Sequence, residues 1–231
     1  MSVYILDTET TGIVDPVPVE VAWIEIDSFI GTLGSFVENF NPGKPISFGA
    51  MSVHHILEAD VADEPPFSEF LLPDDCEYIL GHNIDFDWAA IGKPNVKRIC
   101  TLALSRSLWP DTDSHNLSAL IYFLTDPIDH YEVRERLIKN AHSAYGDCQT
   151  ILSSLLVPII KKLGVTFPID WEKLWDLSEK ARIPTTMPWG KHKGLEIKDV
   201  PSDYKRWLLN QPDVDPYLVQ ALQCGGRSET R

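Results

Sequence analysis

Acidic residues two positions apart are the first feature of this sequence that could do chemistry. Asp7 is the last residue of the run VYILD, which predicts a buried strand ending near Asp7, and Glu9 follows two positions later. Because successive side chains of a strand point to opposite faces, both carboxylates project from one face. Such a pair is by itself more often a solvated strand end, so its meaning depends on other acids in the chain.

Two more acids stand at the start of an expected helix after the apolar run at residues 78–80. Asn83 can cap this helix, and Asp85 and Asp87 would favour the positive end of its dipole. At about 100° per residue, Asp87 lies beside the apolar face that begins at Ile84, whereas Asp85 points away from it. Asp87 is therefore the better candidate for a site at the edge of the core. The alternative is that both acids serve only the helix dipole.

A histidine and a fourth acid lie five residues apart near the last helix of the main body. Within one regular helix His142 and Asp147 would be about 140° apart and could not face one site. The conflict disappears if Ser143 is the N-cap and His142 lies in the preceding loop. Asp147 then continues the row of Ile151 and Leu155 and faces the sheet. A single histidine at such a place is more often structural, so its role depends on the acids.

Four carboxylates from a strand and two helices could converge in a mixed sheet-and-helix domain. Ionised and close together, they would repel one another and raise some of their pKa values unless divalent cations neutralised them. Oxygen ligands suit Mg²⁺ or Mn²⁺ rather than zinc. Such a cluster predicts two-metal hydrolysis of a phosphodiester, with His142 able to take the proton of the attacking water.

Three motifs, in order along the chain, resemble those of the DEDDh exonucleases, a family with the ribonuclease H-like fold. The family pattern D-x-E matches Asp7 and Glu9, H-N-x-x-F-D matches residues 82–87, and H-x(4)-D matches His142 and Asp147. The resemblance covers about residues 1–163. It is strongest to the bacterial exonuclease X group, in residues 45–46, 53–56, 61–65 and 99–110.

The resemblance implies roles for particular residues. The two metal ions, Mg²⁺ or Mn²⁺, would be held by Asp7, Glu9, Asp87 and Asp147, and His142 would be the general base. A turn after the first ligands would hold the 3′-terminal nucleotide, with Asn83 nearby; its residues are Thr8, Thr10, Thr11 and Gly12. Residues 126–140 depart from the family pattern, because they are more numerous and more charged than the equivalent loop.

The expected fold class is α/β: a ribonuclease H-like mixed sheet flanked by helices, with a small C-terminal module. We expect strands at residues 3–7, 19–26, 35–40 and 78–80. Helices are expected at 52–62, 84–91, 100–108, 114–124, 143–163 (kinked at Pro158), about 171–177, and 202–209. The expected domains are an exonuclease domain at 1–163, a linker with a short helix at 164–186, and a small basic module at 187–231.

Two interpretations of the C-terminal module remain open. In one, Lys191 and Lys193 grip a nucleic-acid backbone while Trp189 stacks on a base. In the other, the lysines are solvated turn residues and the large apolar side chains form a small core, namely Trp189, Tyr204, Trp207 and Leu208. The segment also resembles a small module found in bacterial proteins, whose role cannot be carried over.

Charge and cysteine usage restrict the class of protein. Residues 1–150 hold 8 Lys and Arg against 24 Asp and Glu, whereas residues 151–231 hold 12 against 10. The acidic first part disfavours a protein that coats many DNA phosphates. Four scattered cysteines and the absence of an apolar run of about 20 residues predict a cytoplasmic protein without a membrane span.

The resulting hypothesis is a metal-dependent 3′-to-5′ exonuclease acting on DNA 3′ ends, either single-stranded or duplex. RNA is a possible substrate as well, and a 3′ exoribonuclease is therefore one alternative. A non-catalytic nucleic-acid-binding adaptor is the other. The sequence identifies no protein partner.

Overall fold

The computed structural model describes residues 2–140 and 143–224. The chain divides into two compact units, Met1–Ser178 and Glu179–Arg231, and each is described by itself. Among the described helices, none is long and apolar enough to cross a membrane.

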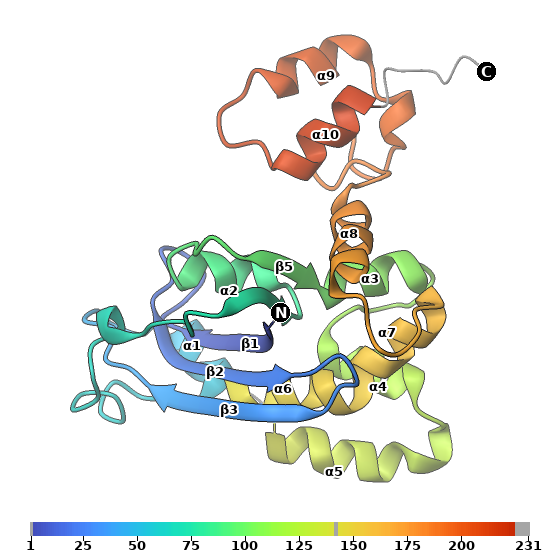
Figure 1. The fold of residues 1–231 in the computed structure, drawn as a ribbon. Coiled ribbons are helices and arrows are strands. Elements are labelled where there is room, and N and C mark those ends of the chain that lie inside the picture. Colours follow the sequence, from blue (N-terminus) through green and yellow to red (C-terminus); the bar gives the residue numbers. More distant parts are fainter. Residues whose placement is uncertain (1, 141–142, 225–231) are drawn as a thin grey trace. The chain divides into compact units, whose positions relative to one another are not determined.

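A mixed five-stranded sheet forms the centre of the first unit (Figure 1). Its strands are β1 (Ser2–Thr10), β2 (Pro18–Ile26), β3 (Thr32–Asn39), β4 (Cys76–Gly81) and β5 (Lys97–Cys100), in the spatial order β3-β2-β1-β4-β5. The first three form an antiparallel meander, whereas β4 and β5 run parallel to β1. Strand β1 is therefore central, with a partner on each side.

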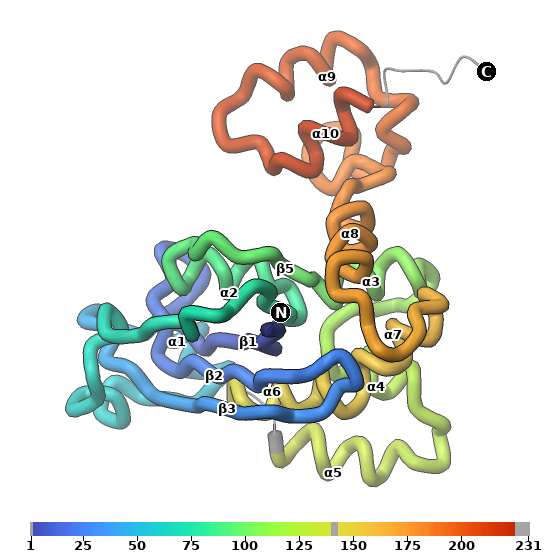
Figure 2. The backbone as a smooth tube through the Cα atoms, viewed as in Figure 1, coloured from blue at the N-terminus to red at the C-terminus, as the bar shows by residue number. Residues whose placement is uncertain are grey.

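Helices flank this sheet: α1 (Phe48–His54), α2 (Ile84–Ala90), α3 (Thr101–Leu108), α4 (Leu117–Leu124), α5 (His130–Asn140), α6 (Ala144–Thr150) and α7 (Leu156–Leu163). Short 3₁₀ turns lie at Phe67–Glu69 and Pro127–Asp129. Helix α6 packs against β1 and β2, and α2 packs against β1, β4 and β5. In Figure 2 the yellow α6 can be followed alongside the blue β2. The expected α/β class is confirmed by this architecture.

Gly81 allows α2 to begin close to β1. A Cβ atom at this position would lie 2.7 Å from the carbonyl oxygen of Leu6 and 2.8 Å from Cδ1 of Ile84. No real Cβ atom tolerates such a contact with backbone, so a larger residue would push the helix away from the central strand. The residue type at position 81 thus determines how near α2 comes to β1.

Several expected boundaries differ from the structure. Strand β1 continues past Asp7 to Thr10, so Asp7 and Glu9 both lie inside it. The helix expected at 52–62 is α1 instead. It begins after Ser47, whose side chain accepts a hydrogen bond from the Ala50 N–H, and it ends at His54, followed by the C-cap His55 with φ 59°. The stretch that follows consists mainly of bends and turns.

The helix expected at residues 143–163 is interrupted before Pro158 rather than at it. Between α6 and α7, residues Ile151–Leu155 form a π-helical turn rather than a simple kink. Pro158 lacks an N–H and cannot bond the carbonyl one α-helical turn earlier, so the backbone is wider here. Helix α5 and strand β5 were not expected.

Residues 164–178 belong to the first unit rather than to a linker. Helix α8 (Trp171–Arg182) begins there, with Trp171 and Leu174 buried. The hydroxyl of Ser178 also accepts a hydrogen bond from the Cys100 N–H at 2.8 Å. The division of the chain therefore falls at Ser178, within α8 and beyond the expected domain boundary at residue 163.

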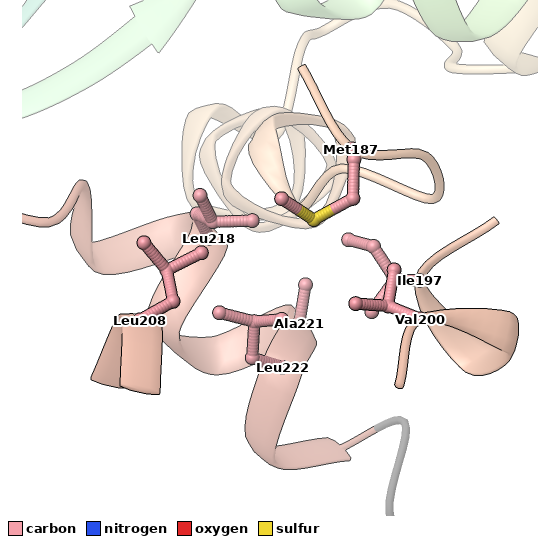
Figure 3. Close-up of a cluster of buried hydrophobic side chains, with 7 residues drawn as sticks. All are labelled: Met187, Ile197, Val200, Leu208, Leu218, Ala221 and Leu222. Carbon is pink, nitrogen blue, oxygen red and sulfur yellow. The ribbon is translucent and has the colours of Figure 1, made fainter. Parts of the chain in front are cut away.

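The second unit is a small helical body with its own apolar core (Figure 3). It contains a 3₁₀ turn at Ile197–Asp199 and the helices α9 (Ser202–Leu209) and α10 (Pro216–Cys224). Its buried side chains are Met187, Ile197, Val200, Leu208, Leu218, Ala221 and Leu222.

All four cysteines are free thiols. Cys100 and Cys148 are buried, Cys76 is partly buried, and Cys224 is exposed. The thiol of Cys148 donates to the carbonyl oxygens of Ile5 and Ala22, and burial raises its pKa well above the ordinary value.

Candidate active site

The four acids singled out in the sequence come together at the central strand. Asp7 and Glu9 lie on β1, Asp87 on α2 and Asp147 on α6. Asp7 experiences the charges of Asp87, Asp147 and Glu9, in that order of strength. Segments far apart in the chain thus place four carboxyl groups within electrostatic reach of one another.

Asp87 is the most deeply buried of the four, at 4% exposed. Its Oδ1 accepts hydrogen bonds from the Thr8 backbone N–H at 3.0 Å and from the Thr8 hydroxyl at 2.8 Å. Asp85, two residues before Asp87, instead forms an ion pair with Arg98. The separation of roles expected from helical geometry is therefore present, since Asp87 faces the sheet and Asp85 does not.

Asn83 precedes α2 but does not cap it with its side chain. Its backbone adopts the left-handed conformation, with φ 74°, and its side chain makes no cap hydrogen bond. The expected capping role of Asn83 was wrong, because this conformation differs from the extended one in which an N-cap side chain reaches the first-turn amides.

Burial and mutual repulsion raise the pKa of every acid in the cluster. Desolvation is the largest cause in each case, followed for Asp7 and Glu9 by the charges of their neighbours. The pKa of Glu9 is raised to about 8, that of Asp87 to about 7 and that of Asp147 to about 6, and that of Asp7 lies well above its ordinary value. The hydrogen bonds from Thr8 act in the opposite direction on Asp87. Such a site favours bound cations or protons.

Glu20 is a fifth acid that the sequence reasoning missed. It is 8% exposed and lies on β2 directly opposite Glu9. Its carboxylate accepts hydrogen bonds from the backbone N–H groups of Tyr145 and Ala144, in the first turn of α6. The signal that could have found it is a single acid within the otherwise apolar run PVEVAW, since a buried acid in a strand needs partners.

Glu20 and Ser143 together satisfy the N-terminal amides of α6. Ser143 is the N-cap, as expected, and its hydroxyl accepts from the Gly146 N–H at 3.1 Å. Glu20 accepts from the N–H groups of Ala144 and Tyr145, so the first turn of the helix is held by strand β2 as well as by its own N-cap. The helix that carries Asp147 is thereby fixed against β2.

A cavity of about 360 Å³ adjoins the acid cluster at Glu9. It is lined by Thr8, Glu9, Thr10, Gly12, Ile13, Ser47, Gly49, Ala50, Val53, His54 and Phe86. One ring nitrogen of His54, Nε2, lies 3.2 Å from the Thr10 carbonyl oxygen, and the other accepts from the Ile56 N–H. His54 therefore supports this wall, and the sequence reasoning did not assign it a role.

Gly12 brings the loop after β1 against α1. Its φ is +149°, and a Cβ atom here would lie 3.0 Å from the Ser47 hydroxyl. The Ser47 N–H donates to the Thr11 carbonyl oxygen at 2.9 Å, which ties the same two segments together. The cavity wall is thus a fixed part of the fold.

The remaining expected site residues lie elsewhere. Thr11 is buried outside the cavity lining, where its hydroxyl accepts from the Val17 N–H at 3.2 Å. Asn83 is exposed and does not line the cavity either. Lys191 and Lys193 belong to the second unit. His142, the expected general base, lies outside the described residues.

The donor set of the cluster fits a hard divalent cation, because it offers only carboxylate oxygens. Within residues 2–140 and 143–224, no group of three or more His, Cys, Asp or Glu side chains is arranged to hold a metal ion as it stands.

Fold and site together define a class of protein, a nuclease with the ribonuclease H-like fold. No protein-family model matches the chain. Over 232 residues it is 30% identical to exodeoxyribonuclease 10 of Escherichia coli strain K12, covering 95% of this chain and 96% of that protein. The chain belongs to the exodeoxyribonuclease 10, or exonuclease X, family of DEDDh exonucleases, whose members are metal-dependent.

Solved structures confirm the fold. Exonuclease X in complex with 5′-overhanging duplex DNA matches with a TM-score of 0.60 and 29% identity, covering 76% of this chain and 99% of that chain. A zinc-bound E. coli exonuclease I with single-stranded DNA matches with a TM-score of 0.54 and 20% identity, over 76% of this chain and 42% of that chain. The resemblance of the three motifs to the DEDDh exonucleases is thus confirmed.

Proposed function

We propose that this protein is a metal-dependent 3′-to-5′ exonuclease that hydrolyses phosphodiester bonds at DNA 3′ ends and releases nucleoside 5′-monophosphates. The observation that carries the proposal is the convergence of Asp7, Glu9, Asp87 and Asp147 beside one cavity. Its family membership and the DNA-bound relatives support DNA as the substrate.

The four acids would hold two Mg²⁺ or Mn²⁺ ions. When bound, such ions activate water for attack and stabilise the negative charge that develops on the phosphate and the leaving oxygen. The burial and mutual repulsion of these acids support this role, because divalent cations would relieve both.

The chain's own residues would position the reacting groups. Thr8 holds Asp87 through two hydrogen bonds, and Glu20 holds the first turn of α6. His142 would take the proton of the attacking water as general base. The cavity at Glu9 would receive the terminal nucleotide beside Thr10 and Gly12. Thr11 and Asn83 would act through the shape of the surrounding loops, because neither lines the cavity.

DNA 3′ ends, single-stranded or duplex, would be the main binding partner. We place the protein in the cytoplasm. Its four free thiols support a reducing compartment, since cytosolic thiols remain reduced.

The test is degradation of a 5′-labelled single-stranded DNA in the presence of Mg²⁺. We expect a ladder of products shortened from the 3′ end, which EDTA abolishes. Asp87→Asn should remove nearly all activity, whereas Asp85→Asn should retain most of it, because Asp85 pairs with Arg98 away from the cluster. Full activity in Asp87→Asn or in Asp7→Ala would refute the proposal.

The same assay separates the alternatives. Matched DNA and RNA oligonucleotides measure the preference, and faster shortening of RNA would identify a 3′ exoribonuclease. An adaptor without catalytic function predicts binding but no metal-dependent shortening of either strand.

A further inference from the structure

The second unit builds its core without its two tryptophans. Trp189 is 45% exposed and Trp207 is 52% exposed, whereas the buried core consists of aliphatic residues and Met187 (Figure 3). Tyr204 packs only partly against this core, and Leu208 lies within it. The hypothesis that these four large side chains form a small core therefore holds for Leu208 and in part for Tyr204, but not for the tryptophans.

Among the tryptophans of the chain, all of which the structure describes, exposure of this extent occurs only in the second unit. The chain contains seven tryptophans, and the other five are buried or only partly exposed. Leaving a large aromatic surface in water costs free energy, so two half-exposed tryptophans in a unit of this size indicate a surface that binds something.

A hydrogen-bonded turn presents two lysines next to Trp189 in the sequence. The Lys193 N–H donates to the Gly190 carbonyl oxygen at 3.1 Å, and the Gly194 N–H donates to that of Met187 at 2.8 Å. Gly190 has φ +78°, and a Cβ atom there would lie 2.9 Å from the Tyr204 hydroxyl. The turn is therefore fixed against α9.

Both lysines of the turn are available to a ligand. Lys191 and Lys193 are exposed, and within the described part of the chain neither forms a salt bridge. By contrast, Lys198 in the same unit pairs with Glu196. Two cations without acidic partners thus stand on a fixed turn.

The turn and α9 enclose a cavity of about 280 Å³. Its lining combines cationic and aromatic side chains with one acid: Lys191, His192, Pro201, Asp203, Tyr204 and Trp207. The rings of His192 and Tyr204 pack edge to face, with 4.6 Å between their centroids. The ring centroids of Tyr204 and Trp207 lie 5.3 Å apart. The result is a short row of rings that ends in the half-exposed Trp207.

We propose that the surface formed by Lys191, Lys193 and Trp207, here called the lysine and tryptophan surface, binds single-stranded DNA. Lys191 and Lys193 contact phosphates, and a base stacks on Trp207. Cations beside exposed aromatic faces are the combination that single strands require, because phosphates need positive charge and unpaired bases need a flat apolar partner. An acidic peptide would use the lysines but would leave the tryptophans exposed.

The charge distribution favours the same partner. Residues 179–231 hold 9 Lys and Arg against 7 Asp and Glu, a net charge of +2, whereas residues 1–178 hold 11 against 27, a net charge of −16. The second unit is therefore the part of the chain that attracts a polyanion. That the strand is DNA rests on the proposed function; the surface itself is argued independently of it.

A closed circular single-stranded DNA tests the proposal, because it has no 3′ end for an exonuclease site. Binding of a fluorescent circle to the full chain in EDTA is followed by anisotropy at several salt concentrations. Lys191→Ala/Lys193→Ala should weaken binding and lower the slope of log K against log salt by about 1.4, since each phosphate contact on a single strand contributes about 0.7. The matched control, Lys161→Ala/Lys162→Ala, removes two exposed lysines of α7 and should leave the slope unchanged.

The aromatic contact is tested by Trp207→Ala and Trp207→Phe. Loss of stacking should weaken binding at least about fivefold in Trp207→Ala, and Trp207→Phe should restore most of it. The circle should also quench tryptophan fluorescence in the unsubstituted protein, which needs no variant to fold. Equal binding by all variants, absence of quenching, or equal displacement of the circle by polyglutamate would overturn the proposal.

The two proposals fail in different ways. If a linear strand is shortened but the circle binds equally well to every variant, the surface is wrong and the exonuclease function stands. If the circle binds as expected but no linear strand is shortened, the function is wrong and the surface stands.

Discussion

Glu20 on β2 lies directly opposite Glu9 on β1. Two acids facing each other across an antiparallel pair repel and are ordinarily destabilising. Here the carboxylate of Glu20 is engaged by the N–H groups of Tyr145 and Ala144, which also lower its pKa against the effect of burial. The acid is retained inside the site because it holds the helix that carries Asp147.

Substitution of Glu20 should separate this positioning role from charge. Glu20→Ala removes the acceptor and should lower the free energy of unfolding by roughly 1–2 kcal/mol. The same variant should also have a lower kcat. Glu20→Gln keeps one acceptor oxygen and relieves the repulsion with Glu9, so it should recover most of both. Urea unfolding and steady-state kinetics measure the two quantities. A Gln variant as impaired as the Ala variant would contradict a positioning role.

Thr8 should be needed for the orientation of Asp87. Thr8→Val preserves shape but removes the hydroxyl that donates to Asp87 Oδ1, while the backbone N–H bond remains. Loss of one hydrogen bond to a buried carboxyl should cost roughly 1–3 kcal/mol of stability and reduce activity. Thr8→Ser keeps the donor and should behave like the unsubstituted protein. Equal activity of the Val and Ser variants would show that the hydroxyl is dispensable.

Removing one acid should stabilise the fold in the absence of metal. Asp7 lies among Asp87, Asp147 and Glu9, so Asp7→Asn relieves repulsion and should raise the unfolding free energy in EDTA by about 1–2 kcal/mol. The unsubstituted protein should gain about 2.7 kcal/mol from Mg²⁺ at 100 times its Kd, and the variant clearly less. Unfolding in EDTA and in Mg²⁺ measures both effects. Asp85→Asn is the control, and a variant destabilised in EDTA would contradict the repulsion.

His82 should make the fold sensitive to acid. Its Nε2 lies 2.8 Å from the His115 carbonyl oxygen, and burial lowers its pKa from 6.5 to about 4. Between these values the unfolded chain binds a proton that the folded chain does not, so stability is lost as the pH falls from about 6.5 to 4, by at most about 3 kcal/mol.

The raised pKa values of the acid cluster act in the opposite direction, because those acids stabilise the fold as the pH falls. The prediction therefore concerns the difference between the unsubstituted protein and His82→Gln, measured by urea unfolding at pH 7 and pH 4.5. The variant should lose less stability on acidification. Parallel losses in both proteins would exclude His82 as the cause.

The sequence predicted the parts of the molecule that carry a strong pattern. The apolar run before Asp7 indicated the central strand, and helical periodicity distinguished Asp87 from Asp85. Ser143 was correctly expected to cap α6, because a hydroxyl before a helical run has few other roles. The order of the acidic motifs then allowed the family to be identified.

Elements without such a pattern were missed. Strand β5 has only four residues, and its first two are Lys97 and Arg98, so it lacks the apolar alternation of a strand. Helix α5 buries only Val133 among residues 130–139, too little for an apolar stripe. The partner of Glu20 could not be predicted either, because the bond joins residues more than a hundred positions apart and exists only once β2 and α6 have packed.

The distribution of thiols offers a route for spectroscopy. Cys148 and Cys100 are buried and out of reach of a reagent in solution, and burial raises the pKa of the partly buried Cys76 to about 12, so its thiol is not ionised near neutral pH. Cys224, at the end of α10, is the one exposed thiol. A maleimide dye should therefore attach there selectively and provide a fluorescent reporter on the second unit without any engineered cysteine.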